Sequence, residues 1–189
     1  MKCRITACRD PACRDSVRRN PARLTADWYS TGAPSLAPAL LGKLLCRRLP
    51  TGKILRRRIT ETEAYYGEED TACHASRGKT ERTAVMYRAG GFAYIYLCYG
   101  IHWLLNVVSG PVDFPEAVLI RGVEGFDGPG KLTKALEIGK DLKGENLTVS
   151  DRLWIEDDGY KPRFRATKRI GIDSAAEKDR NRRWRFVTG

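Results

Sequence analysis

Short apolar runs, each bounded by glycine, proline or polar residues, recur along most of the chain and predict a sheet. Residues 43–49 and 54–65 flank the turn sequence Pro50-Thr51-Gly52-Lys53 and so predict a hairpin. An aromatic strand is expected at 92–99, where Gly100 ends it. The remaining strands are expected at 102–108, 117–123, 153–156, 166–170 and 184–187.

Helical signals are fewer. A short helix is expected at 36–41 and another at 131–138, where three apolar residues have helical spacing after a Gly-Pro-Gly breaker. Residues 67–88 are polar and irregular, which is typical of a loop that carries function. No alternation of strands and helices indicates a doubly wound fold. The pattern therefore predicts an α+β fold: a single compact domain with a mostly antiparallel curved sheet, a few helices and a projecting β-hairpin.

Charge is unevenly distributed along the 189 residues. There are 34 basic and 23 acidic side chains, a net charge of +11, which divides into +11 for residues 1–60, −7 for 61–159 and +7 for 160–189. Basic ends around an acidic, aromatic centre fit a protein that binds phosphates or nucleic acid. An ordinary solvated basic surface is the alternative.

Residues 1–20 predict a flexible basic tail, with Cys3, Cys8 and Cys13 in it, ahead of a folded domain at 21–189. The first residues lack the apolar core of a secretory signal, and no apolar run is long enough to span a membrane. We therefore expect the six cysteines to be thiols and expect no membrane partner. With no C-x-x-C pair and only two histidines, no metal site is expected.

The segment 59–65 (ITETEAY) places Glu61, Glu63 and Tyr65 on one face of a strand. Two carboxylates beside an aromatic ring can supply a base that activates water, although an exposed strand face would show the same pattern. Arg121 interrupts an apolar strand and needs an acidic partner, for which a glutamate is the obvious choice.

The aromatic strand places Phe92, Tyr94 and Tyr96 on one face, whereas Tyr99 has the other parity and sits at the break. Rings of this kind can stack on bases, and a ring at a hairpin tip can wedge between them. Plain core packing is the alternative for each ring.

Other polar residues have chemistry suited to a nucleic acid. His74 and Asn106 offer donors and acceptors for a base edge. Gly130 and Lys131, at the start of the helix expected at 131–138, are candidates for contacts to DNA phosphates.

Together these segments resemble the alkyladenine (3-methyladenine) DNA glycosylase family, over about residues 21–188. The most specific matches are ITETEAY (59–65), YIYLCYG (94–100) and GPGKLTKAL (128–136), in family order. Two departures lie in the loop: Thr83 stands where asparagine is usual, and residues 86–91 replace a stretch richer in glycine and proline.

The resemblance implies roles for individual residues. Glu63 resembles the family's general base, which activates the water that attacks the sugar of a flipped nucleotide. Arg121 resembles the arginine that helps to hold this glutamate and water, and Ile170 resembles a residue whose backbone carbonyl also binds the water.

The same resemblance implies a pocket for the flipped base. Tyr65 and His74 would lie on one side of the base and Tyr96 on the other. Asn106 resembles the asparagine that excludes guanine, and Tyr99 resembles the tyrosine that fills the gap left in the duplex.

The predicted function is a monofunctional glycosylase that removes alkylated or deaminated purines, of the 3-methyladenine, 7-methylguanine and hypoxanthine class, from double-stranded DNA. The resemblance also implies that no metal or organic cofactor is used. We expect a monomer, cytoplasmic and nucleoid-associated in a prokaryote or nuclear in a eukaryote. Three alternatives remain at this point: a catalytically silent damaged-DNA-binding module, a nuclease with Mg²⁺ held by Glu61, Glu63 and Asp70, and a hydrolase of free nucleosides.

Overall fold

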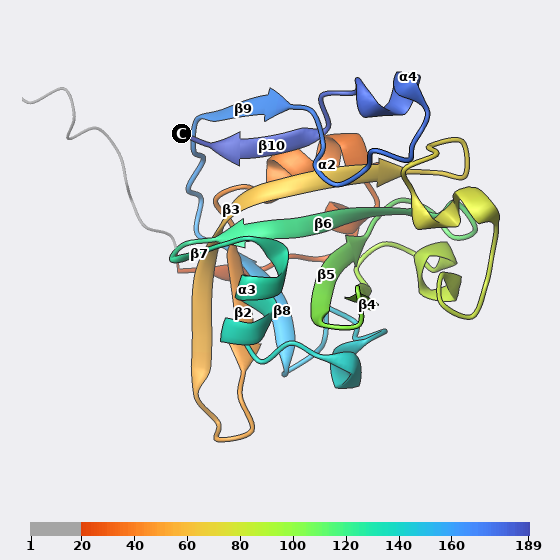
Figure 1. Cartoon of the computed structure of the whole chain (residues 1–189). Helices are drawn as coiled ribbons and strands as arrows, with labels where there is room; N and C mark the ends of the chain where they lie inside the picture. Colours follow the sequence, from red (N-terminus) through yellow and green to blue (C-terminus); the bar gives the residue numbers. More distant parts are fainter. Residues whose placement is uncertain (1–19) are drawn as a thin grey trace, which may run out of the picture.

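The computed structural model describes residues 20–189, so the predicted tail at 1–20 lies, except for its last residue, outside the described part of the chain. The described residues form a ten-stranded antiparallel sheet whose main path runs β1-β8-β2-β3-β6-β5-β4 (Figure 1). The predicted α+β class is confirmed. The strands are β1 (Ala22–Arg23), β2 (Leu44–Arg48), β3 (Ile54–Tyr66), β4 (Ala93–Cys98), β5 (His102–Val108), β6 (Glu116–Val123), β7 (Phe126–Asp127), β8 (Leu153–Asp157), β9 (Phe164–Thr167) and β10 (Arg185–Thr188).

The helices are short and lie between the strands in sequence. They are α1 (Ala26–Tyr29), α2 (Ala33–Leu40), α3 (Pro129–Ala135) and α4 (Glu177–Arg180), with 3-10 turns η2 (His74–Arg77), η3 (Ala84–Tyr87) and η4 (Lys140–Leu142).

The 13-residue strand β3 connects the parts of the sheet. Its first half pairs with β2, as the predicted hairpin requires, and its second half pairs with β6 and β10. The pairing with β6 shifts register on both sides of Glu61. Such irregularities change the direction of side chains along a strand and are common beside functional sites.

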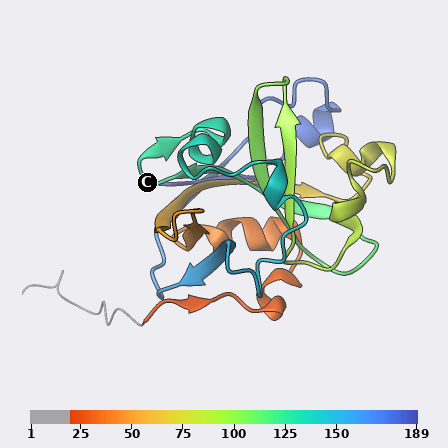
Figure 2. The ribbon, with the colours of Figure 1, turned by 90° about the horizontal axis from the view of Figure 1, so that it is seen from below.

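Helices α2 and α3 lie on opposite sides of the layer that contains β3 and β6 (Figure 2). The apolar residues of α2, among them Leu36 and Leu40, are fully buried in the main core, and so are Leu132 and Leu136 at α3. Both faces of the central strands are therefore covered, which explains the nearly continuous burial of β6.

A second apolar cluster lies under the segment 67–88, which was predicted to be an irregular loop. The segment contains η2 and η3, and its apolar residues pack against the aromatic strand β4. The cluster consists of Cys73, Ala75, Met86, Tyr87, Tyr94, Val108 and Ala117. This packing supports the cavity-lining residues Tyr65 and Tyr96, which contact the cluster.

Several predicted elements have different bounds, and the helix expected at 36–41 lies at Ala33–Leu40. The strand expected at 166–170 lies at Phe164–Thr167, because only these residues pair with β10, and the chain beyond them turns so that Arg169 is buried. The helix expected at 131–138 begins two residues earlier, at Pro129, whose ring suits the first turn of a helix, and it ends at Ala135.

Strands β4 and β5 are antiparallel neighbours joined by residues 99–101. At this turn Tyr99 is 89% exposed and has a φ of 51°, and Ile101 is 72% exposed. A tyrosine in the left-handed region is unusual, because its Cβ crowds the backbone there. In the described part of the chain, no helix has the length and apolar character needed to cross a membrane.

The close approach of Gly90 to the backbone of Tyr29 generates a prediction for stability. A Cβ at Gly90 would lie 2.0 Å from the Tyr29 carbonyl oxygen, whereas at Gly139 the nearest atom would be 3.4 Å away. Gly90→Ala should lower the free energy of unfolding by about 3 kcal/mol, because backbone must move to make room. Gly139→Ala, the matched control, should change it by about 0.5 kcal/mol or less. Urea unfolding of both variants measures the difference, and equal values would contradict the packing described.

Candidate active site

Glu63 lies in the second half of β3, and its side chain has no exposed surface. Three donors reach its carboxylate. The Ile170 N–H lies 2.8 Å from Oε1, the Tyr65 hydroxyl 2.9 Å from Oε2, and Arg121 Nη1 3.5 Å from Oε2. A carboxylate offers about four lone-pair directions to donors. One direction is therefore left without a protein donor.

Arg121 in β6 bridges both glutamates of the predicted acidic pair. Its Nε donates to Glu61 Oε1 at 2.8 Å, a closer contact than the one to Glu63, and Arg185 Nε donates to the same Glu61 oxygen at 2.6 Å. The acidic partner expected for Arg121 is thus present. The Glu61 side chain is only 13% exposed, so the interpretation of this segment as an exposed strand face is wrong.

The environment of Glu63 acts on its charge in two directions. Burial raises the pKa of this carboxyl group, and the Arg121 charge, the Ile170 N–H and the Tyr65 hydroxyl offset part of that effect. Burial and the charge of Glu63 also raise the pKa of Tyr65 well above its ordinary value, so the phenol keeps its proton and remains a donor. A carboxylate of this kind is a stronger base than one in water.

A cavity of about 300 Å³ adjoins this cluster. Tyr65 belongs to both, since its ring lines the cavity while its hydroxyl binds Glu63. Gly171 and Ile172, which follow Ile170, also line the cavity. The structure therefore brings together the five residues predicted to form the base pocket and the wedge: Tyr65, His74, Tyr96, Tyr99 and Asn106.

His74 is held by two polar neighbours. Its Nδ1 lies 3.0 Å from the Tyr94 hydroxyl, and Arg82 Nη2 lies 3.5 Å from its Nε2. Because a guanidinium only donates, Nε2 is the acceptor and Nδ1 carries the hydrogen. Although part of the residue faces solvent, burial of the ring and the charge of Arg82 lower the pKa of His74 to about 4. The imidazole is therefore neutral at neutral pH.

Two side chains cover the Tyr96 ring. The His74 ring centroid lies 4.5 Å from that of Tyr96 at an interplanar angle of 73°, and Arg82 Cζ lies 5.0 Å from the same centroid. A base stacked on Tyr96 needs this space. The arrangement implied by the resemblance, with a base between His74 and Tyr96, thus requires Arg82 and the His74 ring to move aside.

Asn106 and Thr83 are fixed by backbone contacts. Asn106 is 4% exposed, and its Nδ2 donates to the Tyr94 carbonyl 3.1 Å away, across the β4–β5 pair. Thr83, the residue at the unusual loop position, is buried, and its Oγ1 accepts from the Thr80 N–H at 2.8 Å. Thr83 therefore closes the turn that carries Arg82.

Two further predictions concern contacts to DNA: the wedge at Tyr99 and the phosphate contacts at Gly130 and Lys131. The core-packing interpretation is wrong for Tyr99, which is 89% exposed, and right for Tyr94, which is 1% exposed. Gly130 lies in the first turn of α3 against His102, whose Cγ would be 2.9 Å from a Cβ at Gly130. Gly130 thus lies beside the turn end of the β4–β5 pair, and neither Gly130 nor the exposed Lys131 lines the cavity.

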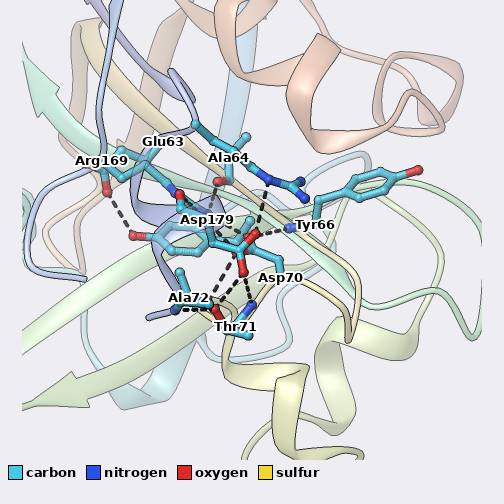
Figure 3. A network of polar contacts seen from close by, with 11 residues as sticks. Glu63, Ala64, Tyr66, Asp70, Thr71, Ala72, Arg169 and Asp179 are labelled. Carbon is cyan, nitrogen blue, oxygen red and sulfur yellow. Dashed lines mark hydrogen bonds and ion pairs between the residues drawn. The ribbon is translucent and has the colours of Figure 1, made fainter. Parts of the chain in front are cut away.

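The sequence analysis did not identify Arg169 as a functional candidate. Its side chain and that of Asp70 are both fully buried and form a two-pronged ion pair, at 2.6 and 2.8 Å (Figure 3). Asp70 was considered only as a metal ligand of the nuclease alternative. The signal in the sequence was the position of Arg169, directly before the residue whose backbone was expected at the site.

The carboxylates of the nuclease alternative are each engaged by arginine. Glu61 contacts Arg121 and Arg185, Glu63 contacts Arg121, and Asp70 is paired with Arg169. Among residues 20–189, no cluster of three or more histidine, cysteine, aspartate or glutamate side chains is arranged to hold a metal ion.

Comparison with known proteins adds an independent finding. A family model described as methylpurine-DNA glycosylase matches residues 27–189. The chain is 45% identical to a protein of Psychrobacter cryohalolentis over 80% of this chain and 85% of that protein, and 41% identical to one of Methanocella arvoryzae over 86% and 90%. Both are named as candidate 3-methyladenine DNA glycosylases. The chain therefore belongs to the methylpurine-DNA glycosylase family.

Proposed function

We propose that this protein is a monofunctional DNA glycosylase that removes alkylated and deaminated purines from double-stranded DNA by hydrolysis. The observation that carries the proposal is the Glu63 carboxylate: it is fully buried, held by three donors, and joined through Tyr65 to an aromatic cavity. A DNA-binding module without catalysis has no use for a buried carboxylate with a raised pKa, and this favours the enzyme over the silent module.

The chemical step follows from this geometry. A water bound at the remaining lone-pair direction of Glu63 gives its proton to the carboxylate as its oxygen attacks C1′ of the flipped nucleotide. The new C1′–O bond forms while the bond between C1′ and the purine breaks, and the bonding electrons leave with the base. Arg121 keeps the carboxylate in place, and the Ile170 carbonyl is the proposed second anchor for the water. No lysine amine takes part, so the sugar–phosphate chain stays intact.

The pocket suits a purine that already carries a positive charge. A base stacked on Tyr96, with Tyr65 and His74 on its other side, takes the place of the Arg82 guanidinium, whose positive charge lies over the Tyr96 ring in this structure. Once Arg82 has moved aside, a cationic 3-methyladenine or 7-methylguanine gains from the electron-rich aromatic faces. The fixed amide of Asn106 is the proposed barrier to guanine. Neutral hypoxanthine needs a proton in addition, for which we assign no donor.

Reaching such a base requires a bent and opened duplex. Tyr99, exposed at the turn between β4 and β5 and also lining the cavity, is the proposed wedge that fills the gap in the stack. Gly130 and Lys131 beside this pair are the proposed phosphate contacts, and the net charge of +11 draws the protein to DNA. One flipped nucleotide occupies one cavity, so a monomer suffices, and we place its work in the cytoplasm, at the nucleoid.

The function is tested by base release. The protein is incubated with EDTA and with two duplexes, one carrying 7-methylguanine and one carrying hypoxanthine, and the free base is measured by chromatography. Release of a free base, with strand breaks only after alkali, is the expected result. Binding without release of either base would support the silent module, and strand breaks without alkali that EDTA abolishes would support the nuclease. Release from a free nucleoside at the rate seen with duplex would support a nucleoside hydrolase.

Glu63→Gln tests the proposed base directly. The amide keeps the shape of the side chain but cannot take the proton of water, so the single-turnover rate of excision should fall by at least about 10²-fold. The dissociation constant for lesion-containing duplex should stay within about threefold of the wild-type value. Glu124→Gln, on an exposed residue beyond the end of β6, is the matched control and should leave both quantities unchanged. Equal losses of binding and rate in Glu63→Gln would contradict the assigned role.

Tyr99→Ser tests the wedge. Removing the ring should weaken binding to lesion-containing duplex by about tenfold or more, because the extruded base restacks without competition. Gel-shift titration gives the affinity, and 2-aminopurine fluorescence beside the lesion gives the extent of extrusion. Val149→Ser, which removes another exposed apolar side chain, should change neither. Unchanged extrusion in Tyr99→Ser would remove this residue from the mechanism.

A further inference from the structure

Arg169 binds four oxygen atoms without any exposed surface of its own side chain. Besides both carboxylate oxygens of Asp70, its guanidinium donates to the Ala64 carbonyl at 2.9 Å and the Asp179 carbonyl at 3.2 Å (Figure 3). Burying a charged pair carries a desolvation penalty, and an apolar pair of the same volume is often as stable. What a two-pronged arginine contact supplies in addition is a fixed orientation.

The oriented group is the peptide that binds Glu63. Ala64 directly follows Glu63, and Ile170 directly follows Arg169. The Ile170 N–H donates to Glu63 Oε1 at 2.8 Å, and Arg169 Nη1 donates to the Ala64 carbonyl at 2.9 Å. Two consecutive residues of β3 are therefore held by two consecutive residues of the C-terminal segment. Neither contact can shift without the other.

Asp70 is held in place by hydrogen bonds other than those from Arg169. Its Oδ2 accepts from the Tyr66 N–H and its Oδ1 from the Ala72 N–H, both at 3.2 Å. Asp179 makes a second connection between the same two segments, because its Oδ2 accepts from the N–H and hydroxyl of Thr71 at 3.0 and 2.6 Å. The carboxylate that accepts from the Arg169 guanidinium is thus held in place by the backbone at the start of the segment 67–88.

The position of Arg169 also bears on the cavity wall. Its Cζ lies 4.9 Å from the ring centroid of Tyr65 and 5.3 Å from that of Trp184. The Tyr65 ring, which lines the cavity and carries the hydroxyl that binds Glu63, therefore rests on the same guanidinium. Two of the three donors to the carboxylate depend on Arg169.

We propose that Arg169, held by Asp70, is a positioning residue for hydrolysis, because it fixes the Ile170 N–H and the Tyr65 ring that orient the Glu63 carboxylate. This inference rests on the function proposed above. Arg169 touches neither water nor base and acts only through its neighbours. Its loss removes hydrogen bonds that stabilise the charged form of Glu63, so the pKa of this group rises further.

The test is the pH profile of single-turnover base release by Arg169→Lys, which keeps the charge but loses the planar fork. Because Glu63 acts as the ionised form, the rate falls as pH drops through its pKa, and the acidic limb of the variant should lie about one unit higher in pH. Asp70→Asn, which weakens the clamp while keeping its shape, should shift the limb in the same direction by less. Affinity for lesion-containing duplex should be unchanged in both variants.

Lys43→Gln is the control, since it breaks another ion pair with a buried cation, Lys43–Asp157 at 2.7 Å, which joins the residue before β2 to the end of β8, away from the site. It should lower stability, as Arg169→Lys does, but leave the acidic limb in place. If Arg169→Lys and Asp70→Asn each lower the rate by the same factor at every pH, without moving the acidic limb, Arg169 is only structural and the inference is wrong. If the wild-type protein releases no base at any pH, the proposed function itself fails.

Discussion

A buried carboxylate is the constraint around which this structure is organised. Glu63 has no exposed surface, so protein donors take the place of solvent water at three of the roughly four lone-pair directions of its carboxylate. Tyr65 supplies one donor from β3 itself, whereas the other two come from distant parts of the chain, Arg121 from β6 and Ile170 from the segment after β9. The sheet order, with β6 and β10 both paired to β3, brings these donors together.

Burial of the Glu63 carboxylate lowers the stability of the folded protein in the ionised state that the proposed function requires. The pKa of Glu63 in the folded state lies above its unfolded value, so the folded protein holds the proton more tightly. The group therefore favours folding at low pH and opposes it once the pH rises through the two values. At neutral pH the ionised carboxylate that the proposed chemistry requires is a destabilising feature. The extensive core around α2 and the central strands compensates for it.

Local patterns predicted most of the fold because each strand carries its own signal. The turn at 50–53, the apolar run of β6 and the break at Gly100 required no knowledge of tertiary structure. The strand expected at 166–170 was misplaced, because the chain leaves the sheet after Thr167, at Lys168 and Arg169. What takes them away is the pairing of Arg169 with Asp70, a contact between residues 99 positions apart that no window of sequence contains.

The site was predicted to a similar degree. The acidic pair of β3 and the aromatic residues of β4 were recognisable from residue type and alternation, and the structure places them around one cluster and one cavity. Arg82 over Tyr96 was not foreseeable, because it depends on where the loop turn at Thr83 directs a long side chain. The roles of these residues in catalysis remain the proposals made above.

The long separation between the two halves of the site has a consequence for biosynthesis. Ile170 meets Glu63 across 107 positions, and β10, near the C-terminal end of the sequence, completes the pairing of β3. Contacts of such range form late, and during synthesis the N-terminal part of the chain emerges first. A growing chain therefore exposes the basic residues that attract DNA well before it completes its carboxylate cluster. The order of the fold along the chain therefore leaves the Glu63 cluster incomplete until the C-terminal segment has paired with β3.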